Sequence, residues 1–192
     1  MYEAIMVNVG TMNLVIGTWA DISWSMIKKL DKYTYAHGTR YMDNGSRNYD
    51  VAGYRLPSVT TILGRTKDQK FLQDWKKKVG EKEAERIKNA SAVRGTSMHK
   101  YLENYVLGKG YEDLTELGQE TKRMAEKVIE VGLAPVSGYF GSEVTVYYPG
   151  LYAGSTDLVG VHNDKETIID FKQANRPKRE EWIGDYKLQA GA

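Results

Sequence analysis

The chain has 192 residues, a net charge of +2 at pH 7 and no cysteine, and 41% of its residues are hydrophobic. This length and composition predict one globular domain with a substantial core, and the lack of cysteine excludes a disulfide framework and thiolate metal sites. No apolar run reaches the roughly 20 residues that span a bilayer, and no basic-then-apolar leader opens the chain, so we expect a cytoplasmic protein with no membrane partner. Because the net charge is small, a nucleic acid would have to be bound by a local basic face.

Residues 1–55 are predicted to form an accessory segment that packs on the rest of the chain. Within it, Ile5–Val9 and Asn13–Ile16 fit short strands, and Trp24–Leu30 fits a short helix. No residue of these stretches suggests a chemical role.

Residues 33–54 alternate aromatic and polar side chains around two turn signals. These signals are Asn44-Gly45 and Ala52-Gly53. Alternation interrupted by such dipeptides is typical of antiparallel strands joined by tight turns, so we expect a small β-meander here.

Small hydroxyl side chains follow the meander, at Ser58, Thr60 and Thr61. They are chemically able to donate hydrogen bonds to a phosphate. Such residues also cap the first turn of a helix, and we favour that role for each of them.

Residues 68–90 predict a helix with two different faces. The apolar side chains at helical spacing on one face are Phe71, Leu72, Trp75 and Val79. The lysines of the other face are Lys70, Lys76, Lys77, Lys78 and Lys82. The lysine face fits an ordinary solvated surface and fits equally well a surface that follows a phosphate backbone.

Residues 91–108 predict a second helix, with Ser91 as its N-cap and Gly108 just after its end. His99 lies at the edge of its buried side. A lone histidine in that place is more often a packed core residue than a metal ligand. Arg94, in the same helix, fits a phosphate clamp or a surface salt bridge.

A third helix is predicted over residues 115–132, with Thr115 as its cap. Its buried stripe is formed by Leu117, Met124, Val128 and Val131. We interpret this helix as scaffold.

Residues 138–148 alternate as a strand that carries Glu143, and Pro149-Gly150 turns the chain into the next strand. A strict two-residue turn would place Glu143 on the opposite face from Asp157. A three-residue turn or a bulge would bring it to the same face, because a slip of one residue exchanges the two faces of a strand.

Residues 154–172 predict a strand, a turn at Asn163-Asp164 and a second strand. A two-residue turn pairs His162 with Lys165, and counting back in that register places Asp157 directly opposite Asp170.

Opposed residues of an antiparallel pair have Cβ atoms roughly 5 Å apart, so the carboxylates of Asp157 and Asp170 can share a divalent cation. Lys172 lies on the same face as Asp170. Carboxylate oxygens suit Mg²⁺ or Mn²⁺, and a lysine beside such an ion can orient a water or stabilise charge on a phosphate. The pattern therefore favours metal-assisted hydrolysis of a phosphodiester over a hairpin with solvated charges.

Residues 179–192 predict a last helix, with Trp182, Tyr186 and Gln189 on one face. For Trp182 we favour a packing role.

Asp157, twelve intervening residues and then Asp170-Phe171-Lys172 resemble the signature of the PD-(D/E)xK nuclease superfamily. More narrowly, the chain resembles the RecB-like exonuclease branch, which includes phage exonucleases and the mitochondrial genome maintenance exonuclease. The further matching motifs are Pro57-Ser58-Val59-Thr60, Gly95-Thr96-x-x-His99 and Tyr186-x-x-Gln189.

The resemblance implies an α/β fold in which a central mixed β-sheet is flanked by helices, a restriction-endonuclease-like core over residues 56–192. It implies that His99 and the carbonyl of Phe171 complete the shell of a metal held by Asp157 and Asp170. Glu143 resembles the acidic residue that precedes the metal aspartate in relatives.

The resemblance also implies that a DNA strand is held by Arg94, Thr96, Tyr186 and Gln189. Gln173 departs from the threonine of many relatives. The family pattern continues with a tyrosine at position 193, and the chain ends at Ala192, so we expect a core truncated at its C-terminus. The iron–sulfur cluster of some relatives is excluded, because the chain has no cysteine.

The sequence therefore predicts a Mg²⁺- or Mn²⁺-dependent deoxyribonuclease that acts as an exonuclease on single strands or duplex ends, in a phage-infected cell if the gene is a phage gene. Two other hypotheses stay open. One is a non-catalytic nucleic-acid-binding module on the same fold, and the other is a metal-dependent endonuclease.

Overall fold

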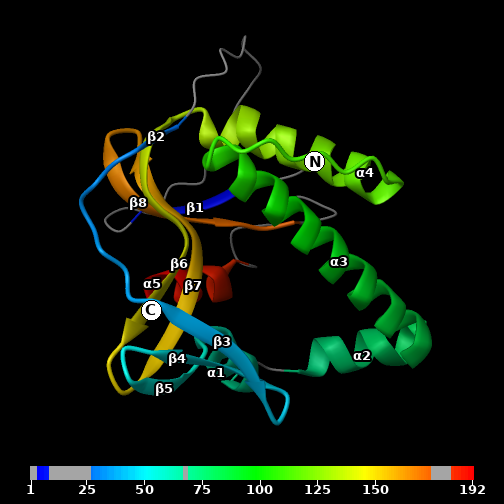
Figure 1. Cartoon of the computed structure of the whole chain (residues 1–192). Helices are drawn as coiled ribbons and strands as arrows, with labels where there is room; N and C mark the ends of the chain where they lie inside the picture. The colour runs from blue at the N-terminus through cyan, green and yellow to red at the C-terminus, as the bar shows by residue number, and fades with distance from the viewer. Residues whose placement is uncertain (1–3, 9–26, 67–68, 174–182) are drawn as a thin grey trace.

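The computed structural model describes residues 4–8, 27–66, 69–173 and 183–192 of the chain. At its centre is a mixed five-stranded sheet (Figure 1). In spatial order its strands are β1 (Ala4–Asn8), β8 (Lys165–Phe171), β7 (Tyr152–His162), β6 (Val136–Tyr148) and β2 (Lys28–Lys29). Strand β2 runs parallel to β6 and the other pairs are antiparallel. The expected α/β class with a central mixed sheet is thus confirmed.

A second, three-stranded antiparallel sheet lies below the first in Figure 1. Its strands are β3 (Gly38–Asp43), β4 (Ser46–Val51) and β5 (Tyr54–Pro57). Both of its turns have two residues with positive φ, at Asn44-Gly45 and at Ala52-Gly53. Such backbone angles suit the twist of a hairpin, and the predicted meander is confirmed.

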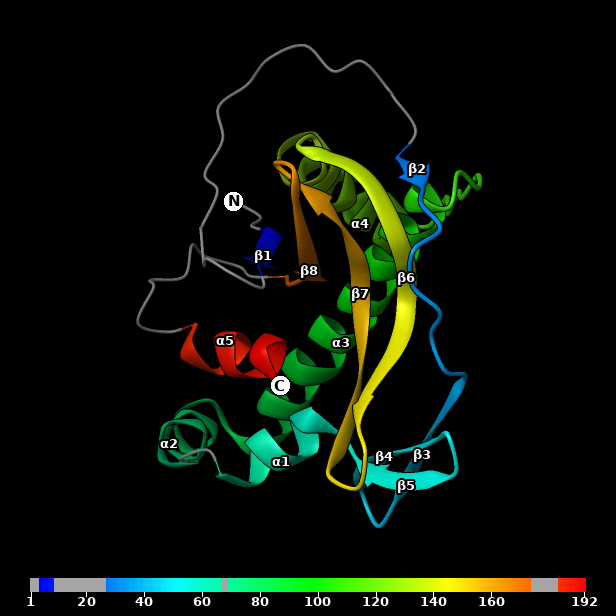
Figure 2. The same ribbon diagram turned by 90° about the vertical axis from the view of Figure 1, so that its left-hand side faces the viewer.

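The helices lie around the two sheets. They are α1 (Val59–Thr66), α2 (Lys70–Val79), α3 (Glu81–Val106), α4 (Glu116–Lys127), a π-helical continuation η1 (Val128–Leu133) and α5 (Gly184–Gly191). Helices α3 and α4 cover one face of the central sheet (Figures 1 and 2). The core between them includes Met98, Leu102, Met124, Leu158 and Ile169, each at most 1% exposed. Among the described residues, no helix is long and apolar enough to cross a membrane.

The hairpin of β6 and β7 joins the two sheets, because it is longer than its pairing with β8 requires (Figure 2). Strand β8 pairs with only the last part of β7, from Leu158 to His162. The other half of the hairpin extends to the small sheet, where Ala153 is buried with Tyr49 and Leu56. Residues just before Leu158 therefore lie where the two sheets separate.

The N-terminal predictions have mixed outcomes. The strand expected over Ile5–Val9 is present as β1, shifted by one residue. The helix expected over Trp24–Leu30 is wrong for its described part, because Lys28 and Lys29 pair with β6 as a strand. Residues 13–16, expected as a strand, lie outside the described residues. The boundary expected after residue 55 falls within β5.

The predicted division of the first two helices is wrong. The break falls at Gly80, whose φ of 85° ends α2, and Ser91 lies inside α3 instead of capping it. Gly108 does follow the end of α3 with a φ of 65°, as predicted. The apolar face of α2 is not buried, since Phe71 is 85% exposed and no residue of α2 is buried.

The last two helices also agree only in part with the predictions from the sequence. Thr115 caps α4 by accepting the backbone N–H of Gly118 at 3.0 Å, and Met124 and Val128 are buried, as expected. The last described helix begins at Gly184 and not at residue 179. Trp182 lies outside the described residues.

Candidate metal centre

Asp157 lies at the point where strands β7 and β8 separate. The two strands pair up to Leu158 and Ile169, and the next pair in that register is Asp157 and Asp170. The turn that sets this register is the predicted one, with His162 opposite Lys165 and a positive φ at both turn residues. Instead of continuing the ladder, the Asp157 Oδ2 accepts the backbone N–H of Phe171 at 2.5 Å. This charge-assisted hydrogen bond fixes the position of the carboxylate. Asp157 as a whole residue is only 9% exposed.

His99 reaches Asp157 from helix α3. Its Nδ1 lies 3.2 Å from the Asp157 Oδ1, and its ring packs edge-on against Phe171 with centroids 6.1 Å apart. Burial by itself would lower the pKa of His99, but the hydrogen bond and the negative charge of Asp157 outweigh it and raise that pKa. The imidazole is thus held beside the Asp157 carboxylate by this contact and by its packing on Phe171.

Glu143 belongs to β6, and the length of the β6–β7 turn decides whether it lies on the same face as Asp157. The turn has three residues between the paired Tyr148 and Tyr152, so Ser142 faces Leu158 and Val144 faces Thr156. Glu143 is then at the level of Asp157, on a backbone with a φ of 52°. The sequence had left this turn open, and the three-residue alternative is the correct one.

A possible ligand set follows from these three positions. One donor atom from each of His99, Glu143 and Asp157 lies within 4.8 Å of the other two. Glu143 is exposed as a residue, yet burial of its carboxylate and the charge of Asp157 raise its pKa. Two carboxylates that repel each other are held together by the fold, and a cation between them would remove that repulsion.

Asp170 and Lys172 stand next to this set. The Lys172 Nζ lies 2.5 Å from the Asp170 Oδ2 and 5.8 Å from the centre of the Tyr186 ring. Burial raises the pKa of Asp170 and the nearby Asp157 adds to this effect, while Lys172 opposes both. The side chains of Asp170 and Lys172 share a face, as predicted. The structure nevertheless groups Glu143, and not Asp170, with Asp157 and His99 as the closest donors.

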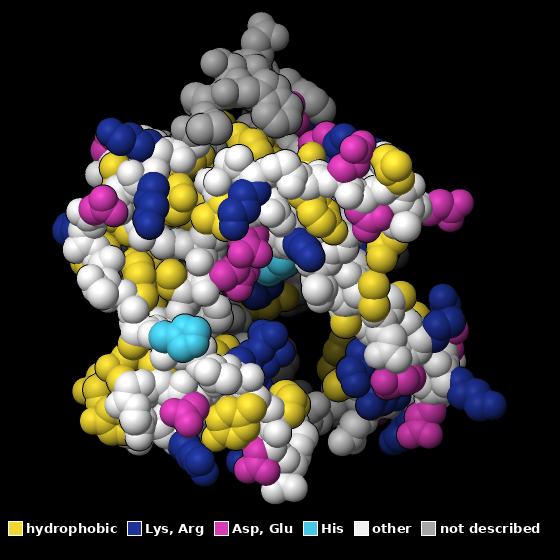
Figure 3. Space-filling model, in the orientation of Figure 1, with side chains coloured by type: hydrophobic (Ala, Val, Ile, Leu, Met, Phe, Trp, Pro, Cys, Tyr) yellow, Lys and Arg dark blue, Asp and Glu magenta, His cyan; other side chains and the backbone are white. Residues whose placement is uncertain are grey.

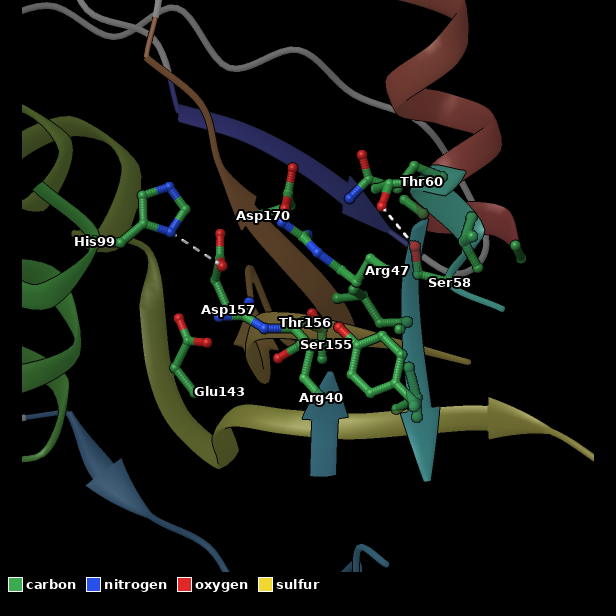
Figure 4. A pocket seen from close by; sticks show the side chains of 18 of the residues that line it. Arg40, Arg47, Ser58, Thr60, His99, Glu143, Ser155, Thr156, Asp157 and Asp170 are labelled. Atoms are coloured by element: carbon green, nitrogen blue, oxygen red, sulfur yellow. Dashed lines mark hydrogen bonds and ion pairs between the residues drawn. The ribbon is translucent and has the colours of Figure 1, made fainter. Parts of the chain in front are cut away.

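All five of these side chains line one cavity of about 780 Å³. Figure 4 shows His99, Glu143, Asp157 and Asp170 around one side of it. Four separate elements therefore contribute to the acidic wall of the cavity: α3, β6, β7 and the end of β8.

The residues predicted to hold DNA are distributed unevenly. Thr96 and Gln189 line the cavity, and Tyr186 lies beneath the ammonium group of Lys172. Arg94 is not among the lining residues, and its Nη1 forms an ion pair with Glu120 of α4 at 3.2 Å. Phe171 contributes its backbone N–H to Asp157 and its ring to the core, and the role of its carbonyl as a metal ligand stays a prediction.

Of the hydroxyl residues after the meander, Ser58 acts as a helix cap, as favoured from the sequence, whereas Thr60 and Thr61 lie inside α1. Ser58 is 2% exposed, and its Oγ accepts the backbone N–H of Thr61 at 3.0 Å at the start of α1. It also exchanges hydrogen bonds of 2.9 Å with the hydroxyls of Thr60 and Thr61.

The sequence analysis missed the opposite wall of the cavity. Arg40, Arg47 and Tyr49 of the small sheet line it, together with Tyr147 and Tyr148 from the tip of the β6–β7 hairpin. The alternation of the meander already placed Arg40, Arg47 and Tyr49 on one face. What the sequence lacked was any sign that this face would meet residues more than a hundred positions later.

The donor set fits a divalent metal ion. It offers two carboxylates and one imidazole from three elements, with a third carboxylate beside them. Oxygen-rich sets suit Mg²⁺ and Mn²⁺, and an imidazole nitrogen is a better ligand for Mn²⁺ than for Mg²⁺.

Comparison of the chain with models of protein families, with curated proteins and with solved structures found no match.

Proposed function

We propose that this chain is a metal-dependent deoxyribonuclease of the RecB-like PD-(D/E)xK type, built on a restriction-endonuclease-like core, and that it acts as an exonuclease. The observation that carries this proposal is the convergence of His99, Glu143 and Asp157 in one cavity with the Asp170–Lys172 pair. The resemblance in sequence names these five residues separately, and the support from the fold is that their side chains line one cavity.

Each of these residues has a role in hydrolysis. His99, Glu143 and Asp157 would hold Mg²⁺ or Mn²⁺, with Asp170 as a further oxygen donor. When bound, the ion would lower the pKa of a water and neutralise charge on the phosphate. Lys172, which forms an ion pair with Asp170, would orient the attacking water and stabilise negative charge on the phosphate oxygens.

The charge of the cavity supports a catalytic protein over a binding module without metal. The acidic wall brings Glu143 and Asp157 together, and these carboxylates repel a phosphate unless a cation lies between them. We therefore expect DNA binding to this cavity to require a divalent ion.

The size of the cavity supports action at a strand end. A cavity of about 780 Å³ is in the range that holds a small ligand, about 300–1,000 Å³. It suits the end of a nucleic acid better than the middle of a continuous duplex.

The test is digestion of end-labelled linear DNA with Mg²⁺, Mn²⁺ or EDTA, beside closed circular DNA. We expect loss of label with either metal, none with EDTA, and intact circles. Lys172→Ala should abolish cleavage, while Lys165→Ala, an exposed lysine at the start of the same strand, should leave it unchanged. Cleavage by Lys172→Ala at the parent rate would exclude this mechanism, and cleavage of closed circles would replace the exonuclease by an endonuclease.

A further inference from the structure

The wall of the cavity opposite the acidic residues carries two arginines on the small sheet. In the β3–β4 ladder Arg40 is opposite Tyr49 and Arg47 is opposite Met42. Directly opposed and alternate residues share a face, so Arg40, Arg47 and Tyr49 are all on one face of this sheet. All three line the cavity.

Both arginine side chains reach into the cavity towards the carboxylates (Figure 4). Arg40 is close enough to Glu143 for its charge to lower the pKa of that residue, against the larger effects of burial and Asp157. Neither guanidinium makes a hydrogen bond or an ion pair with any residue that the structure describes. Two planar, positively charged guanidinium groups thus face the cavity, and their N–H donors are available to a ligand.

The backbone that carries Arg47 is fixed. The Thr61 Oγ1 accepts the N–H of Arg47 at 3.1 Å and donates to its carbonyl at the same distance. The N–H of Ser58 donates to the same carbonyl at 3.0 Å. The start of α1 therefore holds this position of β4 in place, and a preorganised arginine suits a phosphate better than a mobile one.

Aromatic side chains line the same cavity as the two arginines. Tyr147, Tyr148 and Tyr152 line the cavity from the tip of the β6–β7 hairpin, and Tyr148 is 55% exposed. Figure 3 shows that the surface is hollowed between the small sheet and α3, and that Lys and Arg side chains lie inside this hollow. Basic groups that contact a backbone, combined with aromatic rings on which bases stack, are typical of sites for single-stranded nucleic acid.

We propose that Arg40 and Arg47 form a phosphate subsite for single-stranded DNA, which holds a phosphate adjacent to the one at the metal centre. That the polymer is DNA rests on the proposed function, whereas the place where the polymer binds rests on the two arginines. The tyrosines that line the same cavity favour a single strand, because only unpaired bases are free to stack on aromatic side chains.

The experiment measures binding without turnover. The probe is a fluorescent phosphorothioate oligodeoxythymidylate, which resists hydrolysis, in Mg²⁺ at several salt concentrations. The variants are Arg40→Gln, Arg47→Gln and the double variant. The matched control is Arg55→Gln, because Arg55 pairs with Asp50 on the outer face of the same sheet and does not line the cavity.

Hydrogen bonds to charged groups lead us to expect about tenfold weaker binding for each single variant and about a hundredfold for the double variant. The plot of log affinity against log salt should become shallower by about 0.7 in the double variant, since about 0.7 is lost for each phosphate contact to a single strand and the subsite holds one phosphate. Arg55→Gln should stay within about twofold of the parent, a range typical of a charge that makes no phosphate contact. A blunt duplex of the same length should bind weakly and without dependence on Arg40 or Arg47.

The results separate this inference from the nuclease proposal. Parent affinity and salt slope in the double variant, or an equal loss in Arg55→Gln, would overturn the subsite even if the protein cuts DNA. Tight duplex binding that depends on both arginines would overturn the single-strand assignment. Conversely, binding that requires the arginines in a protein that cuts no DNA would leave the subsite standing and remove the nuclease. Binding of Mn²⁺ without DNA, followed by electron paramagnetic resonance, should persist in every arginine variant, and its loss there would show a collapsed cavity instead of a lost contact.

Discussion

The two walls of the cavity rest on cores of different size. The acidic wall is attached to a core that comprises fourteen buried residues of the described part of the chain, between the central sheet, α3 and α4. Among the described residues, the basic wall is attached to a core of four, Tyr49, Val51, Leu56 and Ala153. A fully buried residue in a large core is restrained by many neighbours, so the carboxylates and His99 are held more firmly than the arginines.

The immediate neighbours of the acidic residues show how this restraint acts. Leu158 follows Asp157 and is fully buried, and Met98 precedes His99 and is 1% exposed. Phe171 touches both residues, through its backbone N–H and through its ring. The groups proposed to hold the metal are thus positioned by the folding core itself, and the groups proposed to hold the substrate belong to a smaller unit.

The largest effect is expected at the acidic wall, from Asp157→Asn. This substitution keeps the shape of the side chain and removes its charge, so the proposed metal site loses the negative charge of its most buried ligand. Because a bound metal supplies several kcal/mol of stabilisation to the transition state, we expect DNA cleavage to fall by at least about a thousandfold.

Titration with Mn²⁺, followed by electron paramagnetic resonance, should show the corresponding loss of binding. Asp164→Asn, in the exposed turn of the next hairpin, is the matched control, because asparagine tolerates the φ of 61° found there. Full Mn²⁺ affinity in Asp157→Asn would contradict the proposed ligand set.

The two cores can be compared directly with leucine truncations, Leu158→Ala and Leu56→Ala. These leucines are 0% and 3% exposed, and each truncation should lower the free energy of unfolding by about 3 kcal/mol. Leu158→Ala should also weaken Mn²⁺ binding, because Leu158 positions its neighbour Asp157. Leu56→Ala should leave Mn²⁺ binding unchanged and weaken DNA binding. Urea unfolding measures the effect on stability, and the Mn²⁺ titration measures the effect on metal binding. Equal losses of Mn²⁺ affinity in the two variants would show that the two walls are not held independently.

A smaller effect is expected from Ser58→Ala, which removes the cap of α1. Loss of a serine cap costs about 1 kcal/mol of stability. The cap also fixes Thr61, which holds the backbone of Arg47, so DNA affinity should fall while Mn²⁺ affinity stays unchanged. Ser137→Ala, at an exposed position of β6, is the control in urea unfolding. An unchanged DNA affinity in Ser58→Ala would show that Arg47 does not depend on this contact.

The smallest effect concerns pH and a histidine away from the cavity. His162 is 6% exposed, and burial lowers its pKa from the ordinary value of 6.5. The unfolded chain therefore takes up a proton before the folded chain does, and His162 removes stability as the pH falls below 6.5, until its lower folded pKa is passed. In urea unfolding, the loss of stability between pH 8 and pH 5.5 should be smaller in His162→Phe than in the parent. An equal loss in both proteins would show that His162 is not the group responsible.

Local signals in the sequence were sufficient for the turns and for the register of one hairpin. Asn163-Asp164 predicted a two-residue turn, and the positive φ of both residues is the reason that the prediction holds. Thr115 and Gly108 marked helix ends correctly, because a cap and a left-handed glycine act within a few residues of the chain.

Signals that depend on contacts between distant segments failed or stayed open. The apolar side of α2 resembles a buried face by its spacing, but no described element covers Phe71. The helix break predicted at Ser91 was wrong and falls at Gly80, since a helical stretch contains many residues that are able to cap. The role of Glu143 depended on one extra residue in a turn, which spacing alone does not fix.

The sequence by itself determined which elements form and which residue types carry chemistry: the hairpin with Asp157, Asp170 and Lys172, and the helix with His99. Only the tertiary structure decided that Glu143 joins Asp157 and His99, and that the arginines of a separate sheet face them across one cavity. The physical reason is range. Turns and caps are set by hydrogen bonds between near neighbours in the chain, whereas a cavity is formed by the packing of faces that come from distant parts of it.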